Sequence, residues 1–167
     1  NSDFSTNLKF LKEGKVQAIH EKYVALHGKR SHRSNEGNEK VITFENADRI
    51  SFNLILRAYN DGIAFSYEIP GQGDSCTITD ELTAYQIPDS TRRWLQKFNP
   101  ANEGYYRDYD NGEVQQDWAY PALFLNPDSS VWFLIHEAGL TGTYCGTKLS
   151  NTAVKESYKL SFPDDWN

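Results

Sequence analysis

The chain has 167 residues, close to the length of one domain, and carries a formal charge of −6 with an aromatic content of 14%. Its richest basic stretch, residues 28–33, is short, which argues against nucleic acid as a partner because phosphate neutralisation needs clustered Lys and Arg. No apolar run approaches the roughly 20 residues of a membrane span. The chain begins at Asn1 without a basic start and an apolar leader and contains no Met, so we expect a processed or excised piece of a longer protein.

A β-hairpin is the clearest structural signal in the sequence. Apolar side chains alternate with others along residues 51–59 and again along 63–69, which is the period of a half-buried strand. Between the two runs stands Asn60-Asp61-Gly62, and an Asp-Gly pair supplies the positive φ that tight hairpin turns need. We therefore predict two antiparallel strands joined by this turn.

Shorter strands are predicted along the rest of the chain. Turn residues at 13–15 and 126–130 separate apolar runs, whereas 91–117 is less regular and contains a further turn signal at Asn111-Gly112. No long amphipathic helix, internal repeat or low-complexity linker is present. The strands predicted besides the hairpin are 7–10, 16–19, 76–87, 122–125, 131–136 and 158–162.

These strands predict an all-β, mainly antiparallel sandwich that occupies residues 1–167 as one domain. Paired strands run to both ends of the chain, so we expect the sheets to be truncated. Cys76 and Cys145 either form one disulfide or remain two thiols, and the sequence favours thiols only slightly.

Several common active sites and metal sites have no basis in these residues. The histidines lack the close spacing of zinc ligands, and residues 108–113 have the wrong register for an EF-hand loop, so a hairpin turn is the better interpretation. No Gly-x-Ser-x-Gly elbow and no phosphate-binding glycine loop are present. We therefore assign no catalytic residue within this chain.

Two features remain as candidate sites. Trp94, Trp118 and Tyr120 belong to an aromatic-rich middle whose rings could stack on the C–H faces of a sugar, although filling a β core is their commoner role. Glu137 follows the apolar run 131–135, so its carboxylate is held at the exit of a buried strand and could supply part of a calcium site. Without further information, a solvated or salt-bridged loop residue is the simpler interpretation of Glu137.

Several segments, in order, resemble the N-terminal domain of glycoside hydrolase family 97. The strongest is residues 56–68, which is similar to that family's Arg-Ala-Tyr-Asn-Asp-Gly hairpin nearly residue for residue. The resemblance spans roughly residues 25 to 140. Its shorter matches are 28–31, 79–83 and 135–140.

The resemblance implies a three-part enzyme with an N-terminal β-super-sandwich of the galactose-mutarotase type, a central (β/α)8 barrel and a C-terminal β-domain. It implies action on α-glucosides or α-galactosides within an oligo- or polysaccharide, calcium in the active site, and a periplasmic or extracellular location. The N-terminal domain would pack on its own catalytic barrel and lend Glu137 to the calcium. The barrel, which would carry the acid and the base or nucleophile, is absent from this chain, so the chain alone is expected to be inactive.

Two alternatives stay open at this point. A free-standing carbohydrate-binding module would use the aromatic residues between Trp94 and Tyr120. An aldose-epimerase-like enzyme would need an acid and a base, for which His136 beside Glu137 offers weak support, because adjacent strand residues point to opposite faces.

Overall fold

The computed structural model describes residues 2–71, 77–101, 103–109, 113–142 and 144–163. The described residues contain strands and turns and no helix, so no helix among them could cross a membrane. The chain divides into two compact units, residues 1–77 and 78–167, and each holds one antiparallel sheet. The predicted all-β, antiparallel class is confirmed, whereas the single domain over residues 1–167 stays a prediction.

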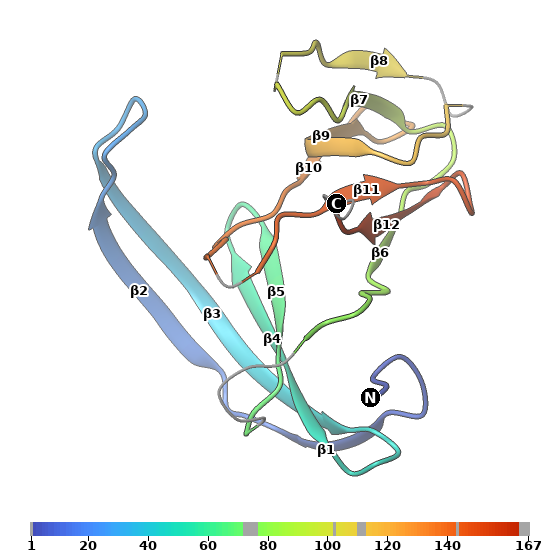
Figure 1. The fold of residues 1–167 in the computed structure, drawn as a ribbon. Coiled ribbons are helices and arrows are strands. Elements are labelled where there is room, and N and C mark those ends of the chain that lie inside the picture. Colours follow the sequence, from blue (N-terminus) through green and yellow to red (C-terminus); the bar gives the residue numbers. More distant parts are fainter. Residues whose placement is uncertain (1, 72–76, 102, 110–112, 143, 164–167) are drawn as a thin grey trace. The chain divides into compact units, whose positions relative to one another are not determined.

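The first unit is a five-stranded sheet arranged around one long strand. One edge of β3 pairs along residues 32–39 with β2 and along 42–45 with β1, so β1 and β2 follow one another along the same edge. The other edge of β3 pairs with β4 through residues 37–45, so the β2–β3 ribbon continues beyond β4 (Figure 1). The strands are β1 (Lys9–Glu13), β2 (Gln17–Val24), β3 (His32–Glu45), β4 (Ser51–Tyr59) and β5 (Ile63–Glu68).

The two predicted strands and the turn between them are confirmed in this sheet, whereas the positive φ expected from the Asp-Gly pair is wrong, because neither Asp61 nor Gly62 adopts it. β4 and β5 pair from Ala58↔Ile63 to Asn53↔Glu68, and the Tyr59 amide donates to the carbonyl of Gly62 at 2.8 Å. β3 was not predicted, because His32 to Lys40 is a polar run without the apolar alternation that indicates a strand.

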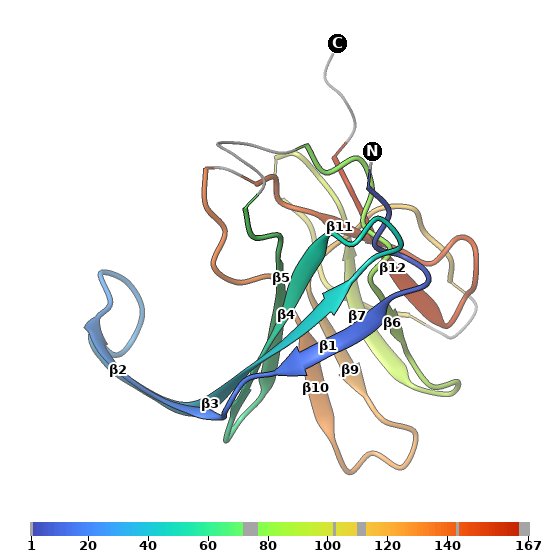
Figure 2. The ribbon, with the colours of Figure 1, turned by 90° about the horizontal axis from the view of Figure 1, so that it is seen from below.

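Packing in the first unit is concentrated at one end of its sheet. Phe52 is buried and its ring lies 5.4 Å from that of Phe4 and 5.5 Å from that of Phe44, with which it stacks. Every residue of β5 is exposed, although its sequence alternates apolar and polar side chains. Figure 2 shows β1, β3, β4 and β5 side by side in this sheet.

The second unit is a seven-stranded sheet in the order β6-β12-β11-β9-β7-β8, with β10 paired to β9. Its core contains a cluster of seven buried side chains: Ile87, Leu95, Trp118, Ala122, Phe124, Leu149 and Tyr158. The strands are β6 (Ala84–Gln86), β7 (Arg92–Lys97), β8 (Arg107–Tyr109), β9 (Trp118–Leu125), β10 (Trp132–Ile135), β11 (Lys148–Ser150) and β12 (Ser157–Ser161).

The β9–β10 hairpin, orange in Figure 2, confirms the strands predicted at 122–125 and 131–136. β9 begins four residues earlier than predicted, at Trp118. The turn between the two strands is closed by Asn126, whose side chain accepts from the Val131 amide at 2.8 Å. The last predicted strand is also present, as β12.

The strand predicted over 76–87 is wrong for most of its described length, because only Ala84–Gln86 is a strand. The side chains before it bond locally, with Asp80 accepting from the Glu81 amide and the Thr83 hydroxyl donating to Glu81. Such local bonds compete with a sheet ladder. Cys76 and the turn at 111–112 lie outside the described residues, and Cys145 is exposed.

Candidate functional site

Glu137 lies two residues after Ile135, the last residue of β10. β10 pairs with β9 as far as Ile135, which faces Ala122 on the core side of the sheet. Tyr120 packs against the same core cluster, and its ring lies 6.1 Å from that of His136, the residue before Glu137. Glu137 therefore stands where the core of the second unit meets solvent, and its side chain is half-buried.

Thr147 holds the carboxylate of Glu137 in place. The Thr147 amide donates to both carboxylate oxygens at 3.1 Å, and its hydroxyl donates to Oε1 in a short hydrogen bond. Thr147 is buried and directly precedes β11, so the donor is as well ordered as the strand. An ionised carboxylate has about four acceptor positions, so these bonds leave capacity for a further ligand.

Tyr120 is half-buried near this carboxylate, and its hydroxyl oxygen is buried. Burial raises the pKa of Tyr120 above its ordinary value, and the nearby Tyr85, Glu137 and Glu81 raise it further against an opposing effect of Thr147. The phenol therefore remains protonated over the physiological pH range.

Glu81 brings a second carboxylate into the same surroundings. Its Oε2 accepts from the Tyr144 hydroxyl at 2.7 Å and its Oε1 from the Thr83 hydroxyl at 3.0 Å. Burial is the main cause that raises the pKa of Tyr144, and both Glu81 and Glu137 contribute to it. The charges of the two glutamates thus act on the same phenol.

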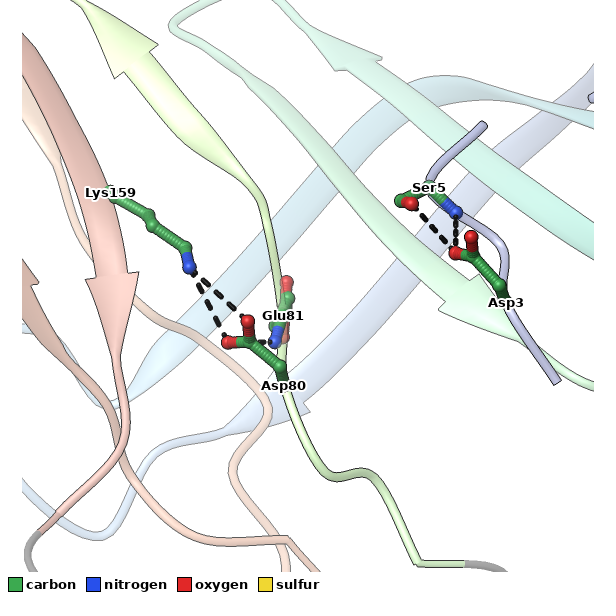
Figure 3. A network of polar contacts seen from close by, with 5 residues as sticks. All are labelled: Asp3, Ser5, Asp80, Glu81 and Lys159. Carbon is green, nitrogen blue, oxygen red and sulfur yellow. Dashed lines mark hydrogen bonds and ion pairs between the residues drawn. The ribbon is translucent and has the colours of Figure 1, made fainter. Parts of the chain in front are cut away.

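The segment that carries Glu81 is held on β12. Lys159 lies 3.3 Å from Asp80 Oδ2, and Asp80 Oδ1 accepts from the Glu81 amide at 2.9 Å, as Figure 3 shows. The Leu160 amide also donates to the carbonyl of Thr83 at 2.9 Å. Figure 3 further shows the Asp3–Ser5 bonds, which belong to the first unit.

The donor set of the site consists of oxygens, which suits a hard cation such as calcium. Calcium takes six to eight oxygen ligands at about 2.3–2.6 Å, and a carboxylate can bind it through one or both oxygens. Among the described residues no group of three or more His, Cys, Asp or Glu side chains could hold a metal. The carboxylate of Glu137 could provide one oxygen ligand of such a site.

The three aromatic residues predicted to bind sugar occupy different environments. Trp118 is fully buried in the core, with its indole N–H bonded to Asn151 at 2.9 Å, so it has no face open to a ligand. Tyr120 packs against the core cluster, near enough to Glu137 for that charge to raise the pKa of its phenol. Trp94 is half-buried on the other face of the sheet. They therefore do not form one sugar-binding cluster.

Thr147, Glu81 and Tyr144 were not predicted as site residues. Glu81 stands within 79–83, one of the segments that resemble the family, which is the signal that could have singled it out. Thr147 and Tyr144 carry no such signal, because both lie outside the segments that resemble the family. His136, adjacent to Glu137, is exposed.

Comparison with known proteins gives a consistent result. A family model described as "Glycosyl-hydrolase 97 N-terminal" matches residues 1–166. A protein of Streptomyces bingchenggensis named "Probable retaining alpha-galactosidase" is 26% identical over 150 residues, which cover 89% of this chain and 23% of that protein.

The chain is also similar to two solved structures of a family 97 glycoside hydrolase from Pseudoalteromonas sp. strain K8, with a TM-score of 0.77 at 23% identity. One is a complex with acarbose, and the other is a variant in complex with panose. Each match covers 95% of this chain and 24% of the other. The chain thus has the fold expected from the resemblance and spans about a quarter of the length of these relatives.

Proposed function

Because the chain belongs to the glycosyl-hydrolase 97 N-terminal family, we propose that it is the accessory N-terminal part of a larger enzyme that hydrolyses α-glycosides. Hydrolysis of a glycosidic bond needs two carboxyl groups on either side of the bond, and we place both of them in a catalytic barrel outside this chain. The match of the family model to both units, over residues 1–166, carries this proposal.

The substrate class follows from what the relatives act on or bind. One relative is named as an α-galactosidase, and the structurally similar enzyme was solved with acarbose and with panose. We propose an α-glucoside or an α-galactoside, and the residues that distinguish the two would lie in the barrel.

Glu137 is the residue through which this part would take a direct role. The side chain is half-buried just after β10, and Thr147 orients its carboxylate. Binding a cation would therefore cost little side-chain conformational entropy. In this proposal Glu137 completes a calcium site whose other ligands the barrel supplies. The calcium, when bound, would polarise the substrate or stabilise negative charge near the scissile bond.

The test is the Glu137→Gln substitution in the complete enzyme. The amide keeps the size of the side chain and removes its negative charge, so we expect calcium to bind at least about tenfold more weakly, which corresponds to about 1.4 kcal/mol. Turnover at limiting calcium should fall accordingly. Calorimetric titration of the metal-free enzyme with calcium measures the first effect.

Two further variants make this experiment specific. Glu103→Gln removes the same charge from an exposed side chain and should leave calcium binding unchanged. Thr147→Val removes the hydroxyl that orients Glu137 and should weaken calcium binding less than Glu137→Gln. Equal calcium affinities for the wild type and for Glu137→Gln would contradict the assigned role.

A further inference from the structure

The outer face of the second unit's sheet carries an aromatic surface separate from the Glu137 site. Arg92 and Trp132 both pair with Leu125, so these three residues form one row across β7, β9 and β10. The next row on the same face contains Trp94, Leu123 and Leu134. Side chains of β10 alternate between exposed and half-buried, which places Trp132 and Leu134 on the face opposite to Phe133 and Ile135.

Two indoles form the centre of this surface. The rings of Trp94 and Trp132 lie 4.8 Å apart between centroids with an interplanar angle of 38°. Trp94 is half-buried, whereas Trp132 is 55% exposed although Leu125, its partner across the strands, is buried. A tryptophan exposed to this degree leaves a large apolar face in water, and its contact with Trp94 keeps that face in one orientation.

An ion pair borders the indoles. The guanidinium of Arg92 lies 4.8 Å above the ring of Trp94 and forms a short contact with Asp108. Asp108 faces Trp94 across β7 and β8, and both members of the ion pair are partly exposed. Hydrogen-bond donors and acceptors therefore stand at the edge of the aromatic surface.

We propose that Trp132, with Trp94, Arg92 and Asp108, forms a surface binding site for a pyranose unit of an oligo- or polysaccharide. A pyranose presents a C–H face to an aromatic ring and hydroxyl groups around its rim. The open face of Trp132 would bind the C–H face, while the guanidinium of Arg92 would donate hydrogen bonds to the sugar hydroxyls and the carboxylate of Asp108 would accept them.

The chemistry favours a sugar over a protein as the occupant. An exposed ion pair lies directly beside the two indoles, so an apolar ring face and groups that donate and accept hydrogen bonds adjoin on this surface. A pyranose can contact an apolar ring face and form hydrogen bonds with charged side chains at the same time. The choice between a glucan and a galactose-bearing polysaccharide as ligand rests on the function proposed above, and the site itself does not involve Glu137.

The test compares variants of the complete protein in native gels containing either soluble starch or galactomannan. The wild type should be retarded by at least one of the two polymers, and Trp132→Ala should weaken that binding at least about tenfold. Trp132→Phe keeps an aromatic face and should retain part of the affinity. Phe10→Ala removes an aromatic ring of equal exposure, 55%, from the other unit and should bind as the wild type does.

Turnover of a small chromogenic α-glycoside separates this site from the catalytic one. Trp132→Ala should leave that turnover and calcium binding unchanged, and Glu137→Gln should leave the retardation by polysaccharide unchanged. Equal retardation of Trp132→Ala and the wild type, or no retardation of the wild type by either polymer, would overturn the proposal. Loss of turnover in Trp132→Ala would also overturn it, because the residue would then act in the active site or in the fold.

Discussion

Asn151 connects two stretches of backbone and the side chain of Trp118 in the second unit. Its Oδ1 accepts from the indole of Trp118 and from the Gln115 amide, both at 2.9 Å. Its Nδ2 donates to the carbonyls of Glu113 and Lys155, both at 3.0 Å. The side chain is 1% exposed, so water cannot replace these four bonds.

Asn151→Ala should therefore lower the free energy of unfolding by about 2–4 kcal/mol, because it leaves buried donors and acceptors without partners. Asn99 is the matched control, since its side chain also bonds to the backbone, at Ala101 and Glu103, but is exposed. Asn99→Ala should cost less than about 1 kcal/mol. Urea unfolding of both variants measures the difference, and equal losses would contradict the role given to burial.

For Glu137, the sequence predicted its place after an apolar strand but not the residues that lie around it. The apolar run before it is a local pattern, and the structure confirms that it forms a strand. Thr147 and Glu81 reach the site from 10 residues later and 56 residues earlier in the chain. No periodicity relates such positions, so these contacts could not be predicted from the residues alone. Trp118 was difficult to assign for another reason. An aromatic residue in a sequence is equally compatible with a core and with a sugar site, and the structure places Trp118 in the core.

Among the strands, β3 organises the first unit, and its Gly37 has no room for a side chain. A Cβ added at Gly37 would lie 2.6 Å from the Tyr59 ring and 2.7 Å from the carbonyl oxygen of Ala58. Gly37 pairs with Tyr59 on one side and Ile19 on the other, so the backbone cannot move without disturbing three strands.

Gly37→Ala should consequently destabilise the first unit by about 1–3 kcal/mol through overpacking. Gly62 is the control, because nothing lies within 4 Å of a Cβ placed there, and Gly62→Ala should change the stability by about 0.5 kcal/mol or less. Thermal unfolding followed by circular dichroism would show the contrast. A Gly37→Ala protein as stable as the wild type would mean that β3 and β4 are not packed as described.

The strands that could be predicted were those with strong local signals. The β4–β5 and β9–β10 hairpins each combine apolar strands with a turn sequence, and both were predicted. β3 was missed because a polar strand held by pairing on both edges has no distinctive pattern of its own. The strand predicted over 76–87 failed for the reverse reason, since Thr and Tyr favour strands while Asp80 and Glu81 bond locally.

For the whole molecule, composition and strand patterns were sufficient for the all-β class, and the resemblance carried by residues 56–68 was sufficient for the family. The division into two compact units was not predicted, because the run Pro70-Gly71-Gln72-Gly73-Asp74 before the boundary near residue 77 is equally typical of a turn between strands. The chain covers about a quarter of its relatives, so the function proposed here concerns its part in a larger enzyme.

A structure of the complete protein crystallised with calcium tests the central claim most directly. We expect a calcium ion about 2.3–2.6 Å from a carboxylate oxygen of Glu137, with Thr147 still bonded to that carboxylate and the remaining ligands contributed from outside residues 1–167. A calcium ion bound elsewhere, with Glu137 in contact only with residues of this chain or with water, would contradict the account.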